Sequence, residues 1–293
     1  MPSLRIDAHQ HFWRYRAGAY PWMGADMSVL AQDHLPEDLL PHLQALRFDT
    51  CIAVQARGST EETRFLLDLA ARSAWIAGVV GWEDLCAEDL DARLDRWADA
   101  PKLRGFRHQV QDEADASCFL AAPAFARGMA LLQARSYVYD VLVFHHQLEA
   151  ASVFCARHDA HWLVLDHLGK PPIRASAAGG VPMADWRRAL QPFRNLPHVM
   201  CKVSGLVTEA DWRSGARARD IASMHECLDV ALDVFGPGRL MFGSDWPMCR
   251  LAASYADIYD VVSQWAEDWL SAGERQDLWG ATAARCYGLS NDG

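Results

Sequence analysis

The chain has 293 residues, of which 51% are hydrophobic and 23% are charged. This length is enough for one large domain or two small ones. Its net charge of −10 argues against binding to nucleic acid, which needs a basic surface, and against a basic membrane-binding face. Eight cysteines occur without a CxxC pair, which is typical of free thiols in a reducing compartment. Because the sequence contains no signal peptide and no apolar run of membrane-spanning length, we expect a soluble, cytoplasmic protein without a membrane partner.

Short runs rich in Val, Ile and Leu alternate along the chain with longer stretches of helical periodicity. The short runs predict strands at 4–9, 50–56, 76–82, 103–108, 138–144, 161–167, 198–205 and 239–245. The periodic stretches predict helices at 59–73, 87–99, 123–135, 147–159, 183–195 and 222–235. Two further helices are expected within 254–289, packed on the outside of the strands.

This alternation predicts one α/β domain over residues 1–293, a (β/α)8 TIM barrel. A doubly wound open sheet is the alternative, but no GxGxxG or GxxxxGK motif follows a predicted strand. The segment 12–45 is too long for a plain connection between the first two strands. Its many aromatic residues predict that it folds over the mouth of the barrel.

Titratable side chains collect at the C-terminal ends of the predicted strands, where barrel enzymes build their active sites. These residues are His9 and His11 on the first strand, Arg107 and His108 on the fourth, His167 on the sixth, Lys202 on the seventh and Asp245 on the eighth. Side chains two residues apart on a strand share a face. We therefore expect His9 and His11 to point to one ion or one substrate, and Gln10 to point away.

Three motifs at these strand ends carry a resemblance to a known family. They are "IDAHQHFW" at 6–13, "LDHLGKP" at 165–171 and "MFGSDWP" at 241–247. With them, nearly the whole chain resembles the amidohydrolase superfamily, and within it the sugar-lactonase branch of L-fuconolactonase-like and L-rhamnono-lactonase-like hydrolases. The resemblance implies a hydrolytic centre formed by His9, His11, His167 and Asp245.

The resemblance also implies at most one divalent metal ion, held by His9, His11 and Asp245. Histidine and carboxylate ligands favour zinc. Many members of the superfamily bridge two metal ions with a carboxylated lysine at the end of the fourth or fifth strand. The lysines of this chain, Lys102, Lys170 and Lys202, lie elsewhere, so we expect no lysine-bridged binuclear centre.

The function implied is the hydrolysis of a small-molecule lactone, an aldonolactone of the L-fucono or L-rhamnono type. Water attacks the carbonyl, Asp245 acts as general base and then general acid, and His167 orients the water or binds the oxyanion. The alternative on the same barrel is a metal-dependent, non-oxidative decarboxylase of an unsaturated carboxylic acid. That reaction needs inward arginines, and only Arg107 is a good candidate. A catalytically inactive binding protein is a third hypothesis, which the intact histidines disfavour.

Four residues are candidates for binding substrate. Arg107 and His108 cannot both face the interior of a regular strand, so one is expected to bind substrate oxygens while the other braces a loop. Lys202 would be an expensive unpaired charge under the helices, so we expect it to face the pocket or its rim, with a buried structural lysine as the alternative. Trp22 is a candidate for stacking on a sugar ring, although a packing role fits equally well. The sequence leaves a homo-oligomer open.

Overall fold

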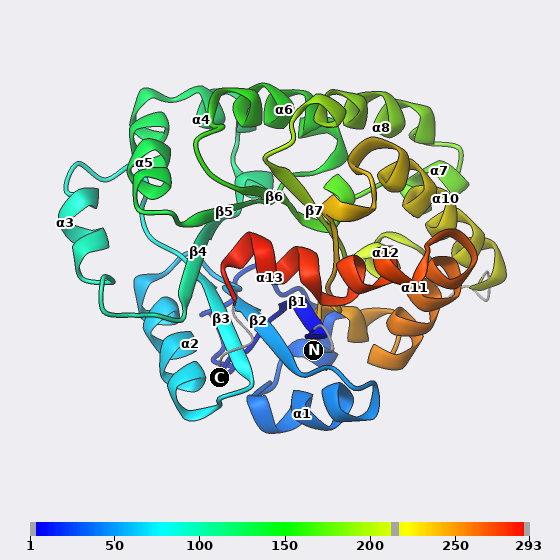
Figure 1. The fold of residues 1–293 in the computed structure, drawn as a ribbon, viewed down its shortest axis with the longest axis horizontal. Coiled ribbons are helices and arrows are strands. Elements are labelled where there is room, and N and C mark those ends of the chain that lie inside the picture. The colour runs from blue at the N-terminus through cyan, green and yellow to red at the C-terminus, as the bar shows by residue number, and fades with distance from the viewer. Residues whose placement is uncertain (1–3, 212–216, 290–293) are drawn as a thin grey trace.

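The computed structural model of the chain describes residues 4–211 and 217–289, so residues 1–3, 212–216 and 290–293 of the predicted domain lie outside the description. Eight parallel strands follow one another in chain order around one sheet, and this confirms the predicted (β/α)8 barrel (Figure 1). The strands are β1 (Ile6–Gln10), β2 (Thr50–Val54), β3 (Ile76–Gly81), β4 (Leu103–His108), β5 (Val138–Val141), β6 (Leu163–Leu165), β7 (Val199–Val203) and β8 (Leu240–Phe242).

The last strand meets the first at their C-terminal ends. The backbone N–H of Asp245 donates to the carbonyl of His9 at 2.8 Å, and that of His11 donates to the carbonyl of Trp246 at 2.7 Å. Beneath these bonds, the buried carboxylate of Asp7 accepts hydrogen bonds from the backbone N–H and the hydroxyl of Ser244, at 2.9 and 2.6 Å. Asp245 is thereby fixed beside the two histidines of β1.

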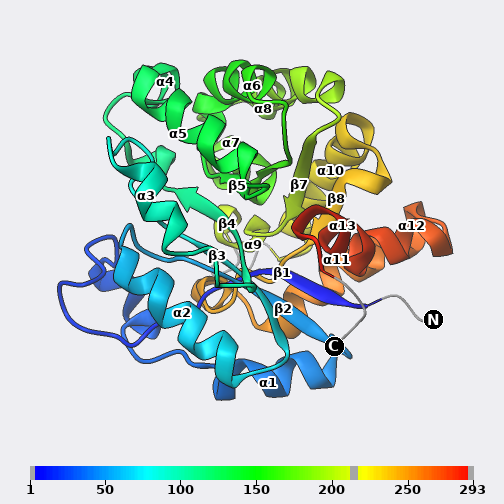
Figure 2. The same cartoon turned by 60° about the vertical axis from the view of Figure 1, so that its left-hand side comes forward.

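Helices surround the strands, as Figures 1 and 2 show. They are α1 (Pro36–Ala45), α2 (Thr60–Arg72), α3 (Leu90–Asp95), α4 (Ala116–Ala121), α5 (Pro123–Ala134), α6 (Leu148–Arg157), α7 (Ile173–Ala177), α8 (Met183–Leu190), α9 (Leu206–Glu209), α10 (Arg217–Phe235), α11 (Tyr255–Trp269), α12 (Ala272–Gln276) and α13 (Thr282–Tyr287). Within the described ranges, none of them combines the length and apolar character needed to cross a membrane.

The helix α13 crosses the end of the barrel opposite the polar strand ends (Figure 1). Its residues Ala283, Cys286 and Tyr287 pack against the apolar interior side chains of the strands, among them Ile6 and Ile52. A second and larger apolar core lies between the outer face of the strands and the surrounding helices.

The structure differs from the predicted elements mainly in the connections. The segment 12–45 contains the helix α1, which the sequence did not predict because Pro36 and Pro41 interrupt the helical pattern. Figure 2 shows the blue part of this segment projecting beyond α2. The short helix α4 was also missed, the helix expected at 87–99 spans only Leu90–Asp95, and the C-terminal segment forms three α-helices instead of two.

A register shift in β1 decides where its histidines point. Ile6 and Ala8 face the interior of the barrel, so unbroken alternation would turn His9 and His11 toward the helices. The pairing of β1 with β2 shifts between Asp7 and Gln10, however, as in a β-bulge. Gly243 of β8's C-terminal extension permits the resulting approach, because a Cβ there would lie 2.5 Å from Cβ of His9. Both histidines consequently enter the interior.

Candidate active site

A pocket of about 360 Å³ opens at the C-terminal ends of the strands. Its floor is formed by His11, His167, Asp245 and Arg107, and His9 lies fully buried just behind them. The wall over the first, second and eighth strands is largely apolar, with Trp22, Met27, Ala56 and Met248. The facing wall is more polar and contains Gln109, Gln111, Asp112, Lys170 and Thr208, together with Leu142, Phe144 and Gly205.

His9, His11 and Asp245 converge on one point of this floor. The Nε2 atoms of the two histidines are 3.2 Å apart. Asp245 Oδ1 lies 3.4 Å from Nε2 of His11 and 3.8 Å from Nε2 of His9. A tetrahedral zinc ion with bonds of about 2.0 Å holds its ligands about 3.3 Å apart. The three donor atoms therefore fit one metal ion.

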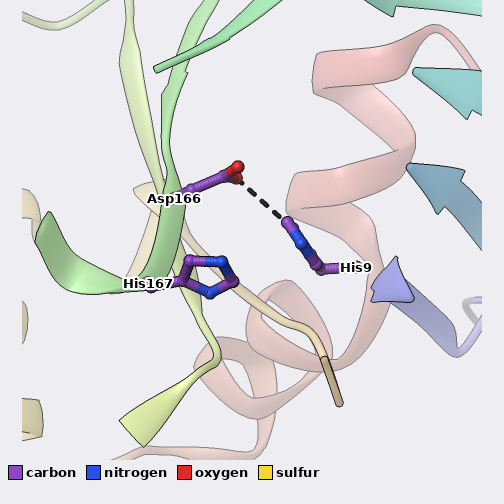
Figure 3. Close-up of side chains that lie close together, drawn as sticks. All are labelled: His9, Asp166 and His167. Atoms are coloured by element: carbon purple, nitrogen blue, oxygen red, sulfur yellow. Dashed lines mark ion pairs between the residues drawn. The ribbon is translucent and has the colours of Figure 1, made fainter. Parts of the chain in front are cut away.

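Polar contacts on the far side of each imidazole set its orientation. His11 Nδ1 lies 2.7 Å from the carbonyl oxygen of Val54, to which it donates, so Nε2 carries the free lone pair. His9 Nδ1 lies 3.3 Å from Asp166 Oδ1, and Figure 3 shows the ring and the carboxylate facing each other. Burial lowers the pKa of His9 well below its ordinary value, and the Lys202 ammonium lowers it further. Its imidazole is therefore neutral, as a metal ligand must be.

His167 stands against His9, with ring centroids 4.5 Å apart (Figure 3). It follows β6 in a left-handed backbone conformation, with φ of 55°, and its Nδ1 lies 2.8 Å from the hydroxyl oxygen of Ser204. Burial lowers the pKa of His167 to about 4, so the ring is neutral at pH 7. When the Ser204 hydroxyl donates to Nδ1, Nε2 carries the ring proton and can donate it in a hydrogen bond.

Asp245 also has a left-handed backbone, with φ of 55°, which aims its carboxylate across the barrel mouth at the histidines. Burial alone would raise the pKa of Asp245, but electrostatic interactions with the surrounding imidazoles of His167, His9 and His11 lower it below its ordinary value. The carboxyl is therefore ionised at neutral pH. This is the form that can bind a metal ion or accept a proton.

Arg107 and His108 point in opposite directions, as expected for neighbours on a strand. Arg107 faces the pocket floor, where its Nη1 lies 3.0 Å from Asp166 Oδ2 and 3.4 Å from Nε2 of His9. Its other terminal nitrogen donates to the carbonyl of Gln55. His108 does not line the pocket, so its predicted contact with substrate is not supported. Instead its Nε2 lies 2.6 Å from Oε1 of Glu113, which braces the loop after β4.

The expectation that Lys202 faces the pocket is wrong. Its side chain does enter the barrel interior, but one layer below the pocket floor, where its exposed fraction is 0%. Its ammonium lies 2.5 Å from Asp140 Oδ2, 3.2 Å from Asp166 Oδ1 and 3.1 Å from His9 Nδ1. Two buried carboxylates satisfy the charge there, so the lysine has no need to reach the rim.

Trp22 lines the pocket from the segment after β1. Its indole N–H donates to the carbonyl of Ala56 at 2.9 Å, and its ring packs edge-on against Trp13 and Tyr20. Trp22 therefore both packs against neighbouring aromatic rings and lines the pocket. The expectation that the aromatic segment 12–45 folds over the barrel mouth is confirmed at this wall.

Sequence reasoning missed Asp140, Asp166 and Lys170 as parts of the site. Asp140 and Asp166 hold Lys202, Arg107 and His9, and Lys170 lines the pocket. Asp140 stands two residues after Val138, which faces the interior, so the period of two on β5 was an available signal. Lys170 lies several residues after the end of β6, and the sequence contained no comparable signal for the direction of its side chain.

Comparisons with known proteins agree with this geometry. Residues 6–289 match the model of the amidohydrolase family. The chain is 60% identical to the L-fucono-1,5-lactonase of Burkholderia multivorans over 99% of this chain and 97% of that protein. It is 33% identical to the L-fucono-1,5-lactonase of Burkholderia ambifaria over 97% and 96% of the two chains.

A solved structure gives the same result in three dimensions. The crystal structure of an amidohydrolase from Burkholderia multivorans with bound zinc is 60% identical and superimposes with a TM-score of 0.93, covering 98% of this chain and all of that one. The family match spans the barrel from β1 to the residues after α13. The chain therefore belongs to the amidohydrolase family.

Proposed function

We propose that this protein hydrolyses the lactone of a sugar acid, with L-fucono-1,5-lactone as the first substrate to test. The observation that carries the proposal is the convergence of His11, His167 and Asp245 on the floor of one pocket, with His9 directly behind them. The two relatives at 60% and 33% identity are both named for this lactone, which favours a lactonase over the decarboxylase alternative. The decarboxylase is also disfavoured because Arg107 is already paired with Asp166.

In the proposed mechanism, Asp245 accepts a proton from the attacking water. The water oxygen adds to the lactone carbonyl, and the neutral His167 donates from Nε2 to orient the water or to hold the developing oxyanion. The bond from the carbonyl carbon to the ring oxygen then breaks. Asp245 returns its proton to that oxygen, and the product is a hydroxy acid that ionises in solution. This sequence uses one carboxylate first as base and then as acid.

We assign the metal position to His9, His11 and Asp245, and propose one ion, zinc, without a lysine-bridged second ion. An ion there would supply a Lewis acid beside the lactone carbonyl. Asp166 and Lys202 would serve by holding the ring of His9 in place. The guanidinium of Arg107 lies 3.4 Å from His9 Nε2 and adds positive charge at the same point.

For substrate binding, we propose that Arg107 faces the carbonyl end of the lactone and Trp22 packs against its ring. Both residues line the pocket. The polar wall formed by Gln109, Gln111 and Asp112 is suited to hydroxyl groups. The substrate would then lie with its hydroxyls toward β4 and its carbonyl over Asp245.

We also propose a cytoplasmic location and a role in carbohydrate metabolism. All eight cysteines are free thiols, and those at positions 51, 155, 201, 227, 249 and 286 are buried. Free, mostly buried thiols are typical of proteins in a reducing compartment.

A proton-release assay with a pH indicator tests the function directly. Purified protein is mixed with L-fucono- and L-rhamnono-lactones and, as controls, with unsaturated carboxylic acids whose decarboxylation releases CO₂. We expect lactone-dependent acid release well above the rate of spontaneous opening and no CO₂. Release of CO₂ without lactone opening would favour the decarboxylase, and inactivity on every substrate together with tight lactone binding would favour a binding protein.

A further inference from the structure

Lys170 is held in the pocket wall by an unusual backbone. It ends a run of four consecutive residues with left-handed φ angles, which are 55° at His167, 53° at Leu168, 66° at Gly169 and 53° at Lys170. Non-glycine residues adopt this conformation rarely, and such strain clusters at functional sites. The N–H of Lys170 donates to the carbonyl of His167 at 2.8 Å, and the ring of His145 hydrogen-bonds to the backbone carbonyl of Lys170.

The side chain of Lys170 lines the same pocket as His167 and Asp245. Its Nζ lies 4.9 Å from the centroid of the Phe144 ring, so an aromatic face covers one side of the ammonium. Within residues 4–211 and 217–289 this ammonium makes no ion pair. Burial lowers the pKa of Lys170, whereas the carboxylates of Glu209 and Asp245 oppose the shift without touching the group.

The other two cations of the site, Arg107 and Lys202, are each paired with protein carboxylates. Arg107 pairs with Asp166 and also donates to the carbonyl of Gln55. Lys202 is enclosed by Asp140 and Asp166 beneath the pocket floor. Among the described residues, Lys170 is therefore the pocket-lining lysine or arginine that makes no ion pair with a protein carboxylate.

We propose that Lys170 binds the carbonyl oxygen of the lactone, stabilises the negative charge that develops on it, and then holds the carboxylate of the product. The proposal deepens the proposed lactonase function and rests on it. The bonds that form and break are those given above, and Lys170 keeps its own protons throughout. Its part is to donate hydrogen bonds from Nζ as the oxygen changes from neutral carbonyl to oxyanion to carboxylate.

Two variants and a matched control test this role. Lys170→Met removes the charge and the donors, Lys170→Arg keeps a charge, and Lys102→Met removes a lysine whose Nζ donates to the carbonyl of Ala70 outside the pocket. We expect Lys170→Met to lower kcat/KM about 10²-fold, the usual scale for one oxyanion donor. Lys170→Arg should recover part of this loss, and Lys102→Met should stay within a factor of about two.

Inhibition separates binding of the carboxylate from a merely structural effect. The product aldonate should inhibit the wild-type enzyme, and its inhibition constant should rise about tenfold or more in Lys170→Met. The matching alditol, which lacks the carboxylate, should inhibit both proteins equally. Equal weakening of both inhibitors, or an unchanged kcat/KM in a folded Lys170→Met protein, would overturn the proposal.

The native protein provides a second test that needs no variant. Reductive methylation with ¹³C-formaldehyde labels accessible lysines, and the chain has only Lys102, Lys170 and the buried Lys202. Adding aldonate should shift the NMR resonance of Lys170 and leave that of Lys102 in place. Absence of that shift at saturating aldonate contradicts the role of Lys170. An inactive wild-type protein contradicts the proposed function instead, so the two failures can be told apart.

Discussion

The ammonium of Lys202 lies 2.5 Å from Asp140 Oδ2 in the closed interior of the barrel, and neither side chain is exposed to solvent. Asp140 also accepts a hydrogen bond from the hydroxyl of Tyr287 on α13, at 2.8 Å. Lys202 in turn contacts His9 and Asp166. A continuous polar chain thus runs along the barrel axis, from the helix that covers one end to the candidate active site at the other.

Breaking this pair should be costly. We expect Lys202→Met to lower the free energy of unfolding by about 3–5 kcal/mol, because it leaves the buried carboxylates of Asp140 and Asp166 without their cation. The double variant Lys202→Met, Asp140→Asn should recover part of the loss, since one of those charges is then removed. Urea denaturation of the three proteins measures both effects. A loss below about 1 kcal/mol in the single variant would show that the pair contributes little.

The two histidines of β1 should act as a unit. His9→Ala and His11→Ala should each strongly reduce kcat, and the double variant should be little worse than the worse single one, because groups that act together are not additive. Gln10 donates to the sulfur of Cys51, away from the pocket, so Gln10→Ala should lower the melting temperature and keep most of kcat. Near-normal kcat in either single histidine variant removes that residue from the catalytic centre.

Asp245→Asn tests the proposed base. Asparagine preserves the shape of the side chain but cannot take a proton from water. The expected loss in kcat is at least about 10²-fold, with a melting temperature near that of the wild type. Kinetic assays measure kcat, and thermal melting followed by circular dichroism shows whether the variant is folded. A folded variant that retains most of its turnover would mean that another group is the base.

Gly205 is expected to control the position of His167. Its φ is 67°, and a Cβ there would lie 2.7 Å from Nδ1 of His167. Gly205→Ala should therefore displace the ring and lower kcat about tenfold or more. Gly179 is a matched control, because its φ is 76° but nothing lies within 4 Å of an added Cβ. Gly179→Ala should cost about 1–2 kcal/mol of backbone strain and leave kcat unchanged.

Metal content tests the ligand assignment independently of turnover. We expect elemental analysis of protein equilibrated with zinc to find at most one tightly bound ion per chain. His11→Ala should lose that ion, because it removes one of the three converging donors. Lys102→Met, outside the pocket, should retain it. Two tightly bound ions per chain would contradict the mononuclear assignment.

The sequence by itself determined the architecture and the outline of the site. Alternating apolar runs and helical stretches are local patterns, so the eight strands and most helices could be placed, with errors at helices interrupted by proline such as α1. The strand ends identified the cluster of His9, His11, His167 and Asp245, because parallel strands in a barrel bring their C-terminal ends to one rim.

Only the tertiary structure decided which way individual side chains point. The register shift in β1 turns His9 and His11 inward, and it depends on pairing with β2 and on the room left by Gly243. Lys202 could not be placed from its strand alone, because its depth depends on Asp140 and Asp166 of other strands. Whether a charged side chain can be buried depends on the partners that surround it in space. The partners of Lys202 are Asp166 and Asp140, which lie 36 and 62 residues away along the chain.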